Sequence, residues 1–173
     1  MRFRIQLLSL LLVASSALAE NPSNFEVKAA TGDKTFSLKE AKGKFVALHF
    51  LLKTECPVCL RHTQSYWEKE GELPNVLQVF LKPDTDKEIE KWAARLPKDE
   101  LKDHPIYRDS EAQLAKQFKI PDGYKFHGQL VHYPATILLD PTGKEVFRYV
   151  GKNNGDRLSF EDLAAKVAEL SRQ

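Results

Sequence analysis

Residues 44–70 read KFVALHFLLKTECPVCLRHTQSYWEKE and contain both cysteines of the 173-residue chain, Cys56 and Cys59. The first nine residues are nearly all apolar, which is typical of a strand buried on both faces of a parallel sheet. A helical pattern of apolar residues follows from Pro57 to about Glu70, and a second apolar run occupies residues 76–81. The order strand, helix, strand predicts an α/β fold with the cysteines at the first strand-to-helix junction.

Helical and strand patterns alternate through the rest of the chain. Helical periodicity is present in residues 86–96, in residues 110–118 and after Ser159, a predicted N-cap. The segments ATILLD (135–140) and EVFRYVG (145–151) flank a Pro- and Gly-containing turn, which predicts a β-hairpin. Residues 120–133 lack a clear pattern and are predicted to form a loop that leads into this hairpin.

The first 19 residues have the composition of a secretory signal peptide. Arg2 and Arg4 precede an apolar stretch that is short for a membrane span, and Ala17-Leu18-Ala19 favours cleavage after Ala19. We therefore expect residues 1–19 to be a signal peptide and residues 20–173 to be a single domain. The protein is expected to be exported to the periplasm or another extracytoplasmic space, without stable membrane insertion after cleavage.

The charge balance argues against nucleic acid as a partner. The chain has 26 basic and 24 acidic residues, and two of the basic ones lie in the predicted signal peptide. The remaining chain is therefore near neutral, without the excess of Lys and Arg that phosphate binding requires.

Two cysteines this close together have three possible uses: a structural crosslink, half of a zinc site or a redox pair. A disulfide that closes about four residues removes only ~2 kcal/mol of unfolded-state entropy, so it is a poor crosslink. Structural zinc needs four ligands, and the chain offers neither a second cysteine pair nor a close histidine pair. Of the histidines, His49 is expected in the core and His62 on the surface.

The redox interpretation has direct physical support. At the start of a helix, unpaired N–H groups and the helix dipole stabilise a thiolate, so Cys56 is expected to be the exposed, attacking thiol. Cys59, one turn later, would resolve the mixed disulfide from a shielded position. Glu55 opposes this by adding negative charge next to Cys56, although Lys53 and Arg61 could offset it.

The segments HFLLKTECPVCLRH, YRDSEAQLAKQFKIP and YPATILLDPTGKEVFRYVG, in this order, resemble exported redoxins of the thioredoxin superfamily. The resemblance is greatest to TlpA-like thiol-disulfide oxidoreductases, which are related to the AhpC/TSA peroxiredoxin group. It implies a single thioredoxin-like domain with a central mixed β-sheet flanked by helices. Cys56 matches the nucleophile, Cys59 the resolving cysteine, and Pro134 a cis-proline that binds the substrate chain together with Tyr133.

That resemblance also implies the reaction and its partners. The expected activity is dithiol/disulfide exchange without a cofactor, between a protein or small-molecule substrate and an unidentified redox partner. The chain departs from the family pattern in having Glu55, where an aromatic residue is common before the first cysteine.

Three alternatives remain open at this stage. Sco-type copper chaperones share the fold and bind Cu(I) through two cysteines and a histidine, a set that Cys56, Cys59 and His132 would match, although Sco cysteines are usually three residues apart. Surface exposure in a loop is the default for His132. A peroxiredoxin-like thiol peroxidase is less favoured, because the Pro and Ser/Thr of its motif are replaced by His49 and Lys53. A redox-inert binding module is disfavoured by the intact cysteine pair.

Overall fold

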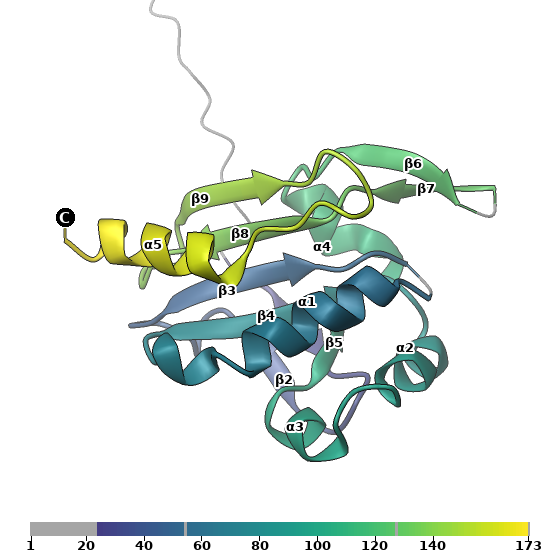
Figure 1. Ribbon diagram of the computed structural model, residues 1–173, viewed down its shortest axis with the longest axis horizontal. Coiled ribbons are helices and arrows are strands. Elements are labelled where there is room, and N and C mark those ends of the chain that lie inside the picture. Colours follow the sequence, from purple (N-terminus) through teal and green to yellow (C-terminus); the bar gives the residue numbers. More distant parts are fainter. Residues whose placement is uncertain (1–23, 54, 127, 173) are drawn as a thin grey trace, which may run out of the picture.

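The centre of the protein is a five-stranded mixed sheet. The computed structural model describes residues 24–53, 55–126 and 128–172. The strand order is β5-β4-β3-β8-β9, with bounds Ile106–Arg108, Val76–Lys82, Phe45–Phe50, Ala135–Leu139 and Glu145–Val150 (Figure 1). Strands β3, β4 and β5 run parallel, whereas β8 pairs antiparallel with both β3 and β9. The predicted α/β fold with a mixed, helix-flanked sheet is confirmed.

Helices cover both faces of this sheet. Helix α1 (Pro57–Trp67) and helix α5 (Phe160–Leu170) pack on one face, and α4 (Gln113–Gln117) packs on the other (Figure 1). Successive residues of β3 serve the two cores in turn, since Ala47 belongs to the first and Val46 and Leu48 to the second. This two-sided burial explains why the strand has no polar face in the sequence.

Shorter elements complete the fold. Strands β1 (Glu26–Lys28) and β2 (Thr35–Ser37) form a small antiparallel pair. Helix α2 (Asp86–Ala93) follows β4, and its N-terminus is capped by a Thr85–Glu88 capping box. The other short helices are α3 (Lys98–Asp103) and the 3₁₀ turns η1 (Glu70–Glu72) and η2 (Ser110–Ala112).

Two local predictions are wrong. Residues 120–133 are not simply a loop, because β6 (Asp122–Phe126) and β7 (Gln129–His132) pair as a hairpin that projects from one end of the main sheet (Figure 1). The helix predicted for residues 110–118 is broken, since Glu111 and Ala112 have positive φ angles of 54° and 56°. Helix α4 starts only at Gln113, where the Asp109 carboxylate accepts the N–H groups of Leu114 and Ala115.

Other predictions are confirmed. Ser159 caps α5 by accepting the Asp162 N–H at 3.1 Å, and the β8–β9 hairpin turns through a Gly143 N–H bond to the Asp140 carbonyl at 2.8 Å. The predicted signal peptide, residues 1–19, lies outside the described residues. Within the part that is described, no helix is both long and apolar enough to span a membrane.

Candidate active site

The two cysteines lie at the junction that leads from β3 into α1. Cys56 is the N-cap of α1, Pro57 is its first residue, and the two cysteines form a disulfide with a Cα–Cα distance of 5.2 Å. Cys56 is half-buried, whereas Cys59 is fully buried. The Sγ of Cys56 accepts the backbone N–H of Cys59 at 3.2 Å. The helix start thus directs a donor at the more accessible sulfur, as expected for a thiolate site.

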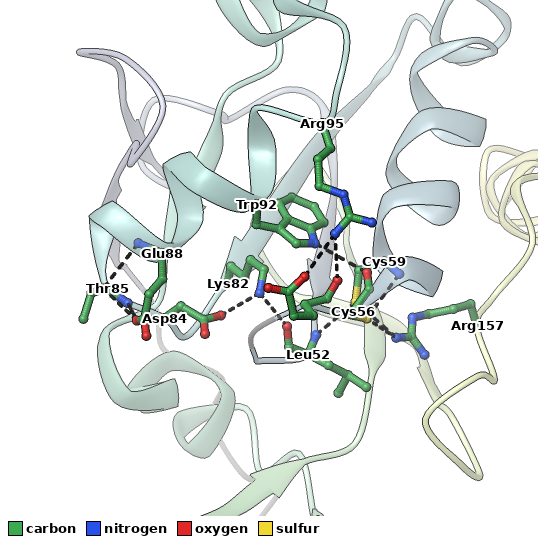
Figure 2. A network of polar contacts seen from close by, with 11 residues as sticks. Leu52, Cys56, Cys59, Lys82, Asp84, Thr85, Glu88, Trp92, Arg95 and Arg157 are labelled. Atoms are coloured by element: carbon green, nitrogen blue, oxygen red, sulfur yellow. Dashed lines mark hydrogen bonds and ion pairs between the residues drawn. A yellow bond between two sulfur atoms is a disulfide. The ribbon is translucent and has the colours of Figure 1, made fainter. Parts of the chain in front are cut away.

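Two further groups donate to the sulfurs. The Leu52 N–H lies 3.4 Å from Cys59 Sγ. The Nη2 of Arg157 lies 3.4 Å from Cys59 Sγ and 3.6 Å from Cys56 Sγ, so one guanidinium contacts both sulfurs (Figure 2). Sequence patterns did not identify Arg157 as a site residue. It belongs to the segment between β9 and α5 and lies 101 positions after Cys56.

Helix α2 and the turn that follows it contact Glu55 and Cys56. The Trp92 indole N–H donates to the Cys56 carbonyl at 3.4 Å, and Arg95 pairs with the Glu55 carboxylate at 3.3 Å (Figure 2). The negative charge of Glu55 therefore has a partner that the sequence did not indicate. The expectation that Lys53 and Arg61 offset Glu55 omitted Arg95, which comes from an element 40 residues away.

A buried ion pair lies behind the cysteine loop. Lys82 Nζ lies 2.6 Å from the Asp84 carboxylate and donates to the Leu52 carbonyl at 2.9 Å, and both charged side chains have no exposed surface. The Lys82 ammonium also sits 5.1 Å from the centre of the Trp92 ring. Burial lowers the pKa of Lys82, and Asp84 opposes that change. The pair links the end of β4 to the residue that precedes the cysteine loop.

A chain of buried imidazoles runs from α1 into the sheet. His62 Nε2 lies 3.1 Å from His49 Nδ1, and His49 Nε2 lies 2.8 Å from the Gln78 side-chain oxygen. His49 is in the core as predicted, but the prediction that His62 is on the surface is wrong, because His62 shares the buried face of α1 with Cys59 and Tyr66. Burial lowers the pKa of His49 to about 4 and holds the pKa of His62 well below 6.5.

The Tyr133–Pro134 segment differs from its prediction. No peptide bond among the described residues is cis, so the cis-proline prediction for Pro134 is wrong. Only these two residues separate β7 from β8. Their backbone groups are also engaged: Tyr133 N–H bonds Pro121 O at 3.0 Å, and Pro134 O accepts Gly151 N–H at 2.8 Å. A substrate role for Tyr133 and Pro134 stays a prediction.

His132 is the histidine of the alternative copper site predicted from the sequence. It is buried in β7, contrary to its default placement in a surface loop, and its Nδ1 lies 2.7 Å from the Tyr133 carbonyl oxygen. Among the described residues, no group of three or more His, Cys, Asp or Glu side chains is placed to hold a metal ion. The set Cys56, Cys59 and His132 stays a prediction for Cu(I), which would bind the reduced cysteines and not the disulfide of this structure.

A pocket of about 440 Å³ opens at the carboxyl ends of the parallel strands. Its walls include Lys53 after β3, Asp84 after β4 and Arg108 at the end of β5. The β7 residues Leu130 and His132 close it from the hairpin side. Because the cysteine loop also follows β3, the pocket and the disulfide lie at the same edge of the sheet, where ligands bind in open α/β folds.

Similarity to known proteins agrees with this arrangement. PrxQ of Xylella fastidiosa, solved as a cysteine-to-serine mutant, superimposes with a TM-score of 0.70 at 16% identity, over 86% of this chain and 91% of that one. AhpC of Enterococcus faecalis gives 0.71 at 19% identity, covering 86% and 89%. The exposed lipoprotein thioredoxin Etrx1 of Streptococcus pneumoniae gives 0.65 at 20% identity, covering 84% and 98%. The TM-scores show that the chain shares the thioredoxin-like fold of these proteins.

Sequence comparison extends this result from fold to family. No curated protein matches the chain. The AhpC/TSA family pattern, however, matches residues 19–146, which is well over half of the 173 residues. The chain therefore belongs to the AhpC/TSA family of thioredoxin-like redox enzymes.

Proposed function

We propose that this protein is an exported thiol-disulfide oxidoreductase of the TlpA-like type, which cycles Cys56 and Cys59 between dithiol and disulfide. Its substrate would be a protein or small-molecule disulfide or thiol, and a separate redox partner would restore the starting state. No cofactor is needed for this chemistry. Export is supported by the sequence of residues 1–19 alone.

The observation that carries the proposal is the unequal placement of the two sulfurs. Cys56 Sγ is partly accessible and accepts a backbone N–H at the start of α1, whereas Cys59 is fully buried one turn later. Thiolate character and access are what an attacking cysteine needs. A shielded partner that can form the disulfide without leaving its helix is what a resolving cysteine needs.

In the reducing direction, the Cys56 thiolate attacks a substrate disulfide and displaces one substrate thiolate. Cys59 then loses its proton to solvent and attacks Cys56 Sγ, which forms the protein disulfide and releases the second substrate thiolate. Two electrons pass from the protein to the substrate, and each released thiolate takes up one proton. The oxidising direction is the same series of steps in reverse. After the reducing direction a partner dithiol supplies two electrons to the protein disulfide, and after the oxidising direction a partner disulfide removes two electrons from the protein dithiol.

The substrate has room beside the cysteine loop. The pocket at the carboxyl ends of the parallel strands is lined by Lys53, which lies three positions before Cys56 in the sequence. Its walls combine charged side chains with the exposed Leu130 side chain. An extended chain that carries a disulfide could therefore present its sulfur to Cys56 while a neighbouring group occupies the pocket.

Trapping with single-cysteine variants tests the proposal. Cys59→Ser is expected to accumulate a covalent mixed disulfide through Cys56, whereas Cys56→Ser should lose both trapping and reduction of a model protein disulfide such as insulin. Wild-type protein that shows no exchange with any model disulfide would contradict the proposal.

Two added measurements address the alternatives. Consumption of hydrogen peroxide faster than that of disulfide substrates would favour a thiol peroxidase. Tight Cu(I) binding by the reduced protein that is lost in His132→Ala, together with an absence of thiol exchange, would favour a Sco-like copper chaperone. In the proposed enzyme, His132→Ala should keep both exchange steps at the cysteines and alter at most the affinity for a substrate that occupies the pocket lined by His132.

A further inference from the structure

One cationic side chain contacts both reacting sulfurs. Arg157 Nη2 lies 3.4 Å from Cys59 Sγ and 3.6 Å from Cys56 Sγ, within the range of N–H···S hydrogen bonds (Figure 2). Figure 2 shows the guanidinium on the side of the disulfide opposite to Trp92 of α2 and to Arg95, which follows α2. The sulfur pair therefore has a guanidinium on one side and a helix on the other.

The guanidinium is held in place by the segment that carries it. Its Nη1 donates to the Asn154 carbonyl at 3.0 Å and to the Asp156 carbonyl at 2.9 Å. The Asp156 carboxylate in turn accepts the Tyr149 hydroxyl at 2.5 Å and the Lys152 N–H at 2.8 Å. One end of the fork is thus fixed on backbone carbonyls, and the other end is aimed at the sulfurs.

The same segment is also anchored on the helix that carries the cysteines. The Tyr66 hydroxyl of α1 donates to the carbonyls of Leu158 and Ser159, at 3.2 and 3.0 Å. The position of Arg157 relative to the sulfurs therefore depends on a direct contact between its own segment and α1. Preorganised donors of this kind need no rearrangement when charge develops on the atom they face.

The acidic residues nearest to the site have hydrogen-bonding or ion-pair partners of their own. Glu55, the acidic residue next to Cys56, is paired with Arg95. The Asp156 carboxylate accepts the Tyr149 hydroxyl and the Lys152 backbone N–H, and the Arg157 charge also contributes to lowering the pKa of Asp156. The field of Arg157 also extends inward, since its charge contributes to lowering the pKa values of His62 and His132.

We propose that Arg157 is a catalytic residue of the exchange reaction, and that its guanidinium stabilises whichever sulfur is the thiolate. This inference rests on the proposed function. Before attack on a substrate, the charge lies on Cys56. During resolution it lies on Cys59, which is buried and receives only the Leu52 N–H and Arg157 as donors among the contacts described here. Contact with both sulfurs lets one side chain serve both steps.

The inference has a measurable consequence for redox balance. A cation that stabilises the thiolate of the reduced form favours the dithiol over the disulfide, so the wild-type protein is expected to be more oxidising than a variant without it. An opposite charge at hydrogen-bonding distance commonly shifts a pKa by one or more. Arg157→Gln should therefore change the exchange equilibrium with glutathione about tenfold, which corresponds to about 30 mV for a two-electron couple.

The experiment compares variants in two readouts. In the Cys59→Ser background, alkylation rates across pH give the Cys56 pKa, which Arg157→Gln should raise by about one. In the two-cysteine protein, Cys56 is first joined to thionitrobenzoate in a mixed disulfide. The rate at which Cys59 then releases thionitrobenzoate measures resolution, and Arg157→Gln should slow this rate about tenfold. Arg157→Lys, which keeps the charge but loses the fork, should lie between Arg157→Gln and wild type.

Two controls separate the guanidinium from the segment that holds it. Arg172→Gln removes an equal charge from an exposed position near the C-terminus and should match wild type. Tyr149→Phe loosens the Asp156 anchor but retains the guanidinium, so its effect should be small. Equal pKa, equilibrium and resolution rate in wild type and Arg157→Gln would overturn the inference, as would an Arg172→Gln variant that reproduces the whole effect.

Failure of this inference is distinguishable from failure of the proposed function. If the wild type exchanges disulfides but does not depend on Arg157, only the role of Arg157 is wrong. If the wild type does not exchange disulfides at all, the proposed function fails first.

Discussion

Acidification is expected to destabilise the protein through two histidines that the fold keeps neutral. His49 has no exposed surface, and its environment consists of His62, Gln78, Thr136 and rings of the core. Burial lowers the His49 pKa from 6.5 to about 4. Burial also lowers the pKa of His62, and the positive charges that His49 and Arg157 can carry act in the same direction.

The size of the effect follows from the His49 pKa. Between pH 6.5 and 4 the unfolded chain binds a proton at His49 and the folded protein does not, so the free energy of unfolding falls as the pH falls through this window. Above pH 6.5 the contribution of His49 is fully present, and below pH 4 it is fully lost. A pKa difference of this size corresponds to about 3 kcal/mol, as an order of magnitude. That is a large part of the stability of an ordinary domain.

Urea unfolding of wild type and His49→Gln at several pH values between 4 and 7 measures this contribution. Glutamine keeps a polar group opposite Gln78 and Thr136 but does not titrate. The comparison uses only the pH dependence of the difference in stability, so a constant difference between the two proteins does not affect it. Buried or hydrogen-bonded carboxylates such as Asp109 and Asp140 also titrate, but they are present in both proteins and cancel. Parallel stability curves for the two proteins would refute the assignment, and His62→Gln should show a change of the same sign.

Two other predictions concern the site and the core. Glu55→Gln removes the negative charge next to Cys56 and should lower the Cys56 pKa. Because the Glu55 side chain is 70% exposed and already paired with Arg95, alkylation of Cys56 near neutral pH should accelerate only about twofold. Slower alkylation would contradict this prediction. Leu163 has no exposed surface in the core between α5 and the sheet, so Leu163→Ala should cost about 2–5 kcal/mol in urea unfolding, and a loss under 1 kcal/mol would show that the site can collapse around the cavity.

The three central strands of the main sheet were predictable because they are largely buried on both faces. Strands β3, β4 and β8 appear in the sequence as nearly continuous apolar runs. Short apolar runs that alternate with helical segments are typical of buried strands. Strands β1, β2 and β5 have only three residues each, which is too short for any periodicity to be visible. The β6–β7 hairpin was missed because its sequence does not alternate regularly between polar and apolar residues.

The site was predictable only as far as it is local in the sequence. The cysteine pair, the helix start at Pro57 and the relative accessibility of the two sulfurs all follow from residues 44–70. Arg157, Trp92 and Arg95 reach the same loop from segments 36 to 101 residues away. A lone arginine or tryptophan carries no local signal of such a contact, and only the folded arrangement reveals it. The burial of His62 was missed for a related reason, since the helical face was assigned from its apolar residues alone.

Membership of the AhpC/TSA family and the geometry of the site bear on different steps of the chemistry. A peroxide would oxidise the Cys56 thiolate to a sulfenic acid, and Cys59 would then displace water to give the same Cys56–Cys59 disulfide that exchange with a disulfide produces. The oxidised structure is therefore common to both reactions, and the first step alone separates them. In that step the chain lacks the Pro and Ser/Thr of the peroxiredoxin motif, and one of the replacements, His49, is bound in the core to His62 and Gln78. A histidine held by these partners in the core does not replace the proline of the motif, and this agrees with our proposal that Cys56 attacks a disulfide.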